Sequence, residues 1–169
     1  MSNIFYAEEQ KVNNRWLWLL LATITIVFLY GFAEQLILKH PQATNSASNW
    51  AMFFIGLLSF GALYLIYSIK FSFQIDEEGI KYRFSPFHIT ERIIQWDDIT
   101  TLYVRKYKPI AEYGGWGIRT LSFKKNIAYN ISGNYGLQIE LKNGKKILFG
   151  TQNPEELEKI ITHFYNLSE

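Results

Sequence analysis

Apolar residues follow two different patterns along this chain. Two runs near the N-terminus carry no charge, WLWLLLATITIVFLYGFA beginning at Trp16 and WAMFFIGLLSFGALYLIYSI beginning at Trp50. As helices they would measure about 27 Å and about 30 Å, close to the hydrocarbon thickness of a bilayer. Both runs are apolar on every face, and the rest of the chain is too short to surround two such helices. The pattern therefore predicts two transmembrane helices, at 16–38 and 50–69.

The charges that flank these runs predict their orientation. Lys11 and Arg15 precede the first run and Lys70 follows the second, whereas the connection at 39–49 contributes Lys39 and a histidine. Because basic residues collect on the cytoplasmic side, we expect both termini there, with an N-terminal segment at 1–15 and an extracytoplasmic loop at 39–49. No small-x-small cleavage site follows the first run, which favours a membrane anchor over a signal peptide.

From Lys70 onward the apolar positions alternate, as they do in strands. Phe71, Phe73 and Ile75 alternate with polar residues, and Asn143-Gly144 joins two further alternating runs as a type I′ hairpin would. Seven or eight short strands are expected, at 71–75, 80–84, 91–96, 99–107, 118–123, 127–131, 136–142 and 145–150. The predicted fold class is therefore a membrane α-helical hairpin plus a mainly-β domain at 70–169, with about seven antiparallel strands in a barrel or sandwich.

One helix is predicted at the C-terminus. Asn153 can cap it, Pro154 suits its first position, and Glu156 completes a capping box. Its apolar residues fall on one face, which predicts that the helix covers one end of the sheet. These residues are Leu157, Ile160, Ile161, Phe164 and Leu167.

Composition excludes several classes of function. The chain has 169 residues and no cysteine, which rules out disulfides, thiol nucleophiles and cysteine-ligated metals. A formal net charge of +2 gives no reason to expect nucleic-acid binding. The histidines are scattered, Asp97-Asp98 suits a turn or cap better than a cation site, and no phosphate loop or nucleophile elbow occurs. We expect no enzyme activity, no metal and no cofactor.

The segment 105–125 is the strongest candidate for binding. It is rich in lysine and arginine, its one acidic residue is Glu112, and it contains the sequence YGGWG. Glycines can expose amide N–H groups as anion-binding loops do, so this loop would contact anionic headgroups or an acidic peptide. The alternative is a tight loop with solvated charges and a packed tryptophan. The candidate residues are Arg105, Lys106, Lys108, Tyr113, Gly114, Gly115, Trp116, Gly117 and Arg119.

Two segments resemble the bacterial pleckstrin-homology-like (PH-like) domains that follow two membrane spans. They are a W-x-x-I motif at Trp96–Ile99, within IQWDDITTLYVRKYKPIAEYGGWGIR, and an I-x-x-G-T-x-x-P-E-x-L motif at Ile147–Leu157. The resemblance covers the architecture from Phe5 to the last helix and implies a multi-pass protein of the bacterial inner membrane. It brings no catalytic residues. The phosphoinositide pocket of eukaryotic PH domains does not carry over, because the turn at Asp76–Gly79 is acidic.

Two functions from different classes are therefore expected. The first is a membrane protein whose cytoplasmic PH-like domain is a binding or scaffold module for a protein partner or a second copy. The second is a module that senses anionic lipid through the basic loop at 105–125. A subunit of an oligomeric transporter or channel is a more remote expectation.

Overall fold

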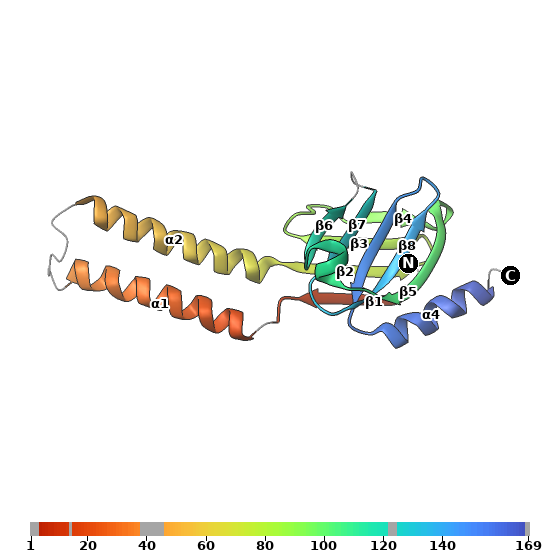
Figure 1. Ribbon diagram of the computed structural model, residues 1–169, viewed down its shortest axis with the longest axis horizontal. Helices are drawn as coiled ribbons and strands as arrows, with labels where there is room; N and C mark the ends of the chain where they lie inside the picture. Colours follow the sequence, from red (N-terminus) through yellow and green to blue (C-terminus); the bar gives the residue numbers. More distant parts are fainter. Residues whose placement is uncertain (1–3, 14, 38–45, 122–124, 168–169) are drawn as a thin grey trace. The chain divides into compact units, whose positions relative to one another are not determined.

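The computed structural model describes residues 4–13, 15–37, 46–121 and 125–167 (Figure 1). The chain divides into two compact units, a sheet domain formed by Met1–Val12 with Ile69–Glu169, and a helical segment, Asn13–Ser68. Residues 39–45, most of the predicted extracytoplasmic loop, lie outside the described residues.

The first sheet of the domain begins with the N-terminus of the chain. Its four strands are antiparallel and lie in chain order, although β1 and β2 are separated in sequence by the whole helical segment. The strands are β1 (Ile4–Lys11), β2 (Lys70–Asp76), β3 (Gly79–Ser85) and β4 (Arg92–Gln95).

The second sheet has five strands in the order β5-β8-β9-β7-β6. Strands β7 and β9 are parallel, and the other pairs are antiparallel. A 3-10 turn η1, Trp96–Asp98, leads into this sheet, and a short helix α3, Pro109–Tyr113, joins its first two strands in sequence. The strands are β5 (Ile99–Lys106), β6 (Gly117–Leu121), β7 (Asn126–Asn130), β8 (Tyr135–Leu141) and β9 (Lys146–Thr151).

The core lies between the two sheets. Period-two alternation puts Phe71 and Phe73 of β2 on the inner face, where their rings lie 5.3 Å and 5.6 Å from that of Phe149 on β9. The predicted C-terminal helix is confirmed as α4, Pro154–Leu167, which adds Leu157 and Ile161 to the core. The side chains of Phe164 and Leu167 lie outside the described residues.

The predicted barrel of about seven antiparallel strands is wrong. The described strands form two separate sheets, one of four and one of five strands, and one pair is parallel. Alternation shows which residues of a strand face the core, but it does not fix the order or direction of the strands. The prediction also omitted β1, whose inward residues Tyr6, Glu8 and Gln10 include two polar side chains and so lack the apolar signal of a strand.

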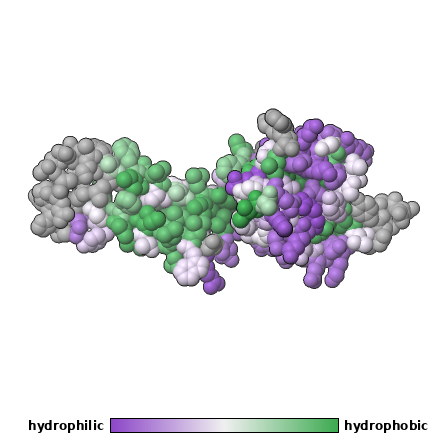
Figure 2. Space-filling view, in the orientation of Figure 1, coloured by the Kyte–Doolittle hydropathy of each residue, from purple (hydrophilic) through white to green (hydrophobic). Residues whose placement is uncertain are grey.

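The helical segment consists of two antiparallel helices, α1 (Arg15–Ile37) and α2 (Ser46–Ser68). Ring contacts join them near both ends, between Trp18 and Tyr67 at 6.5 Å and between Phe32 and Phe53 at 6.2 Å. Figure 2 shows hydrophobic residues over most of the visible surface of these helices.

The prediction of two transmembrane helices is not supported. Within the described residues, only Arg15–Glu34 of α1 is long and apolar enough to cross a membrane. The apolar stretch of α2 runs over Phe53–Ser68, which is about 24 Å long at ~1.5 Å per residue. That length falls short of the roughly 30 Å hydrocarbon core of a bilayer.

The pairing of β1 with β2 constrains the whole chain. Lys11 at the end of β1 lies opposite Lys70 at the start of β2, so the helical segment replaces the turn of a β-hairpin. Both ends of that segment therefore start from the same end of one sheet. We call this end of the domain, marked by Val12 and Ile69, the exit end.

Candidate functional site

Arg105 of the predicted binding loop is held inside the domain. It projects from β5, and its Nε donates to Oε1 of Gln138 at 3.0 Å. Its Nη1 donates to Oε2 of Glu112 at 2.8 Å, and its Nη2 to the hydroxyl of Tyr113 at 3.3 Å. Burial alone would raise the pKa of Glu112, but hydrogen bonds from the Lys108 amide and from Arg105 outweigh it and lower the pKa. Arg105 therefore fastens α3 to the second sheet.

The glycines of the loop build a helix cap. Gly114 ends α3 in the left-handed conformation, with φ of 70°, and its N–H donates to the carbonyl of Ile110 at 2.9 Å. The N–H of Gly115 donates to the Pro109 carbonyl, and that of Gly117 to Oδ1 of Asn130, both at 2.9 Å. Because all three amides donate within the domain, they do not form the anion cradle that the sequence suggests.

The two lysines of the predicted set, Lys106 and Lys108, have different surroundings. The Nζ of Lys106 lies 5.8 Å from the ring centroid of Tyr135, which is the geometry of a cation–π contact. Lys108 is exposed at the start of α3, where its backbone N–H donates to Glu112. Lys124, which contributes to the basic character of the segment, lies outside the described residues.

Five of the nine predicted residues line two separate concave surfaces. Arg105 and Tyr113 line a groove of about 460 Å³ on the outer face of the second sheet. Its charged groups are matched within the groove, since Arg105 pairs with Glu112 and Nζ of Lys146 lies 2.7 Å from Oε1 of Glu140. These internal pairs leave little net charge with which to attract an ionic ligand.

Trp116, Gly117 and Arg119 belong to a different pocket, of about 450 Å³, at the exit end. The indole Nε1 of Trp116 donates to the carbonyl of Gly133 at 3.2 Å, and Nε of Arg119 donates to the Trp116 carbonyl at 2.9 Å. We call this cavity the exit-end pocket. It is lined mainly by apolar side chains, and its residues are Val12, Ile69, Phe84, Phe87, Trp116, Gly117, Ile118, Arg119, Asn130 and Ile131.

Sequence reasoning predicted three of the ten residues that line the exit-end pocket and missed the other seven. Phe87 is 64% exposed and lies in the loop after β3, beside Ile89, which is 87% exposed. Two large apolar residues just after the Ser85-Pro86 break were a visible signal, since turns usually carry polar side chains. Val12 and Ile69 gave no such signal, because only the β1–β2 pairing brings them to one place.

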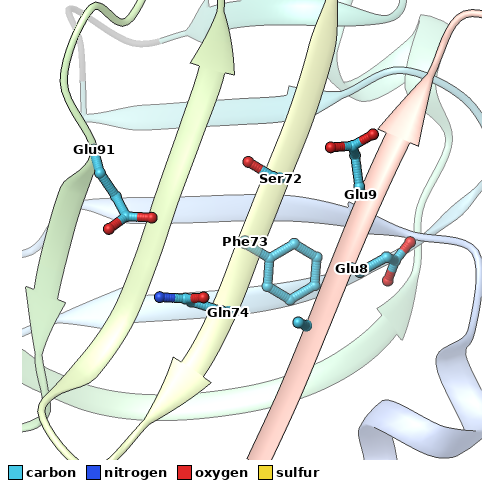
Figure 3. Close-up of a pocket in the computed structure, with 7 residues that line it drawn as sticks. Glu8, Glu9, Ser72, Phe73, Gln74 and Glu91 are labelled. Atoms are coloured by element: carbon cyan, nitrogen blue, oxygen red, sulfur yellow. The ribbon is translucent and has the colours of Figure 1, made fainter. Parts of the chain in front are cut away.

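A third concave surface, of about 240 Å³, lies on the outer face of the first sheet. Figure 3 shows Ser72 and Gln74 of β2 between Glu9 on one side and Glu91 on the other. Nζ of Lys11 lies 2.7 Å from Oε1 of Glu9, and this hydrogen bond lowers the pKa of Glu9. Among the described residues, no three histidine or carboxylate side chains gather in a way that could hold a metal ion.

No family model matches the chain, and no curated protein is similar to it. The resemblance to PH-like membrane proteins therefore stays a prediction.

Glu8 of β1 is the centre of a buried polar cluster that sequence reasoning also missed. Its carboxylate accepts hydrogen bonds from the hydroxyls of Tyr6 and Thr151, at 2.7 Å and 2.6 Å. The carboxylate also accepts hydrogen bonds from Nε2 of Gln10 and from the backbone N–H of Gln152, both at 2.8 Å. Burial and the hydrogen bond to Glu8 raise the pKa of Tyr6, which keeps its hydroxyl protonated as a donor. The cluster joins β1 in the first sheet to the end of β9 in the second.

His88 has a structural place as well. Its Nδ1 accepts a hydrogen bond from the Phe84 amide at 3.3 Å, and its ring packs edge-on against Tyr82 and Tyr129. Burial and the nearby Arg92 lower its pKa, so the imidazole is neutral at pH 7.

Of the three concave surfaces, the exit-end pocket is the one whose chemistry suits a ligand, because it has apolar walls beside a single guanidinium.

Proposed function

We propose that this protein is a membrane-anchored, non-catalytic binding module whose sheet domain recognises a protein partner beside the bilayer. The observation that carries the proposal is the insertion of an apolar helical segment between β1 and β2, two neighbouring strands of one sheet. Helices α1 and α2 expose large apolar side chains along their length, which water solvates poorly and lipid solvates well. The paired strands bring both ends of the segment to the same end of one sheet.

The place of β1 supports an anchor that is retained rather than a cleaved signal sequence. Cleavage after α1 would remove Glu8, whose carboxylate receives four hydrogen bonds, and would expose the edge of β2. The domain therefore needs the residues that precede the apolar helix.

The free edge of the second sheet supports a protein partner. Strand β6 has β7 as its one neighbour among the described strands, and Arg119 to Leu121 are exposed. An extended peptide can add to such an edge through backbone hydrogen bonds. Lipid sensing through Arg105 and the glycine amides of the loop has less support, because these groups are bound within the domain.

Replacing residues 13–68 by a short glycine–serine linker tests the anchor. Val12 and Ile69 flank the paired residues Lys11 and Lys70, so a few linker residues can join them. We expect the full chain to stay in membranes after carbonate extraction and the linker variant to be soluble, with the far-UV circular dichroism of a folded sheet. Extraction of the full chain by carbonate, or a linker variant that remains in membranes, would contradict the proposal.

A photo-crosslinking residue in place of Thr120 on β6 tests the partner in intact cells. The matched control carries the same residue at Lys142, which is exposed in the turn after β8. We expect adducts of discrete mass from position 120 and none from position 142. Equal labelling at both positions, or none at position 120, would count against partner binding at this edge.

A further inference from the structure

The exit-end pocket lies at the end of the domain to which both ends of the helical segment are joined. Ile69 directly follows the last residue of α2, and Val12 lies three residues before the first residue of α1. Three residues of extended chain span at most about 10 Å. If the helices are in lipid, as the proposed function requires, the exit end of the domain lies within this reach of the membrane surface.

Exposed apolar side chains gather at this same end. Because Ser85 at the end of β3 lies opposite Lys70 at the start of β2, the following loop with Phe87 and Ile89 projects from the exit end. Trp116 lines the exit-end pocket together with Phe87, and its side chain is 43% exposed. Aromatic rings of this kind are favoured at the boundary between headgroups and acyl chains.

Basic residues lie at the exit end of the domain, and acidic residues lie at the opposite end of β2. Lys70 and Arg119 lie at the exit end, whereas the turn at the far end of β2 contains Asp76, Glu77 and Glu78. These three carboxylates outnumber Lys81, which pairs with both Asp76 and Glu78. Arg119 forms no ion pair with any described residue, and its Nε is bound to a backbone carbonyl of its own loop. An anionic leaflet would attract the exit end and repel the far end.

We propose that the exit-end pocket is a lipid-binding surface: Phe87, Ile89 and Trp116 insert between phospholipid acyl chains, and Arg119 pairs with a lipid phosphate. This inference rests on the proposed function, because the helices bring the pocket to the bilayer. It goes beyond that function, because it assigns the domain a fixed orientation on the membrane. The occupant is phospholipid rather than protein because the apolar pocket and the basic residues occur together at the one end of the domain that the chain holds against lipid.

Single nitroxide labels can test this orientation, since the chain has no cysteine of its own. The full chain is reconstituted in phosphatidylcholine vesicles with a minor share of phosphatidylglycerol, with one cysteine at Ile89. The control at Glu77 lies at the opposite end of β2, about 20 Å away along the strand. A second control at Ile26, on the exposed face of α1, reports the anchor itself. Power-saturation electron paramagnetic resonance then compares accessibility to oxygen, which concentrates in lipid, and to a water-soluble nickel complex.

We expect labels at 26 and 89 to be several-fold more accessible to oxygen than to nickel, and the label at 77 to show the reverse. A label at 89 that behaves like that at 77, with 26 in lipid, would overturn the lipid-binding surface and leave the anchor intact. A label at 89 that neither reagent reaches would also overturn it, in favour of a protein in the pocket. A label at 26 in water would overturn the proposed function itself.

Trp116→Ser in the chain labelled at 89 extends the test to the pocket. We expect a several-fold fall in the ratio of oxygen to nickel accessibility at 89, while the label at 26 is unchanged. The matched control is Tyr135→Ser, which removes a similarly exposed aromatic ring that does not line the pocket. Equal effects of the two substitutions would overturn the role of Trp116 in lipid binding.

Discussion

The helical segment and the sheet domain bury their apolar side chains in different ways. In the helices, Phe60 is 65% exposed, and most of its large apolar neighbours are exposed as well. In the domain, Phe149 is fully buried among the rings of Phe71, Phe73 and Tyr82. The domain therefore supplies its own apolar environment, whereas the helices depend on one from outside the chain. The same substitution should have different consequences in the two regions.

Phe→Ala substitutions at these two positions give the largest contrast. Phe149→Ala leaves a cavity between the sheets and should lower the free energy of unfolding by about 3–5 kcal/mol. Phe60→Ala removes a ring that packs against little protein and should change it by less than about 0.5 kcal/mol. Chemical denaturation of the full chain in detergent micelles, followed by circular dichroism, measures both. Equal losses would show that the helices also depend on internal packing.

Two adjacent carboxylates sharpen the comparison inside the domain. Glu8→Gln places an amide where four donors converge and should destabilise the domain by about 1–3 kcal/mol. Glu9→Gln alters an exposed carboxylate paired with Lys11 and should cost less than about 1 kcal/mol. Denaturation of the two variants under the same conditions provides the measurement. A small effect at Glu8 would show that β1 is not held by this cluster.

Arg105→Gln tests whether the basic loop is part of the domain's structure or a binding surface. Loss of the hydrogen bonds to Gln138, Glu112 and Tyr113 should destabilise the domain by about 1–2 kcal/mol. It should also speed proteolysis at α3. Lys108→Gln serves as the control, since its exposed side chain should leave both readouts unchanged. Unchanged stability in Arg105→Gln would favour a ligand role for this guanidinium.

The smallest expected effect is a dependence on pH. The pKa of His88 is below its ordinary value in the folded domain, chiefly because the ring is buried, whereas the unfolded chain titrates near 6.5. Between these two pKa values the unfolded chain binds the extra proton, so stability falls as the pH drops below about 6.5. His88→Asn, whose Oδ1 can accept from the Phe84 amide, should flatten this slope in thermal melts across pH 5 to 7. A slope unchanged by the substitution would assign it to other groups.

Local patterns in the sequence predicted local structure well. The period-two residues from Phe71 to Phe84 face the core, and α4 begins at Pro154 as its capping residues indicate. The arrangement of the sheets was beyond such patterns, because the parallel β7–β9 pair and the β1–β2 pair depend on contacts between distant residues. Strand β1 was missed because Glu8 and Gln10 are polar yet buried, and each forms a hydrogen bond with a partner far along the chain.

The candidate site was predicted only in part for the same reason. Trp116 and Arg119 were among the predicted residues, and both line the exit-end pocket. Phe87, Val12 and Ile69 joined them only through strand register. Arg105 was predicted to bind a ligand because the sequence shows a basic residue but not the carboxylate that pairs with it. In the structure that carboxylate belongs to Glu112.

The position of β1 also imposes an order on the protein's biosynthesis. Glu8 emerges from the ribosome early, yet its partner Thr151 follows 143 residues later, which is roughly 10 s of translation. The apolar helices emerge in that interval, before β2, so the helical segment is complete before β1 can pair. Strand β1 can then join the sheet only if the two ends of the helical segment come together. A segment whose two ends are held apart would keep β1 from β2, so completion of this sheet requires the segment to return to its starting point.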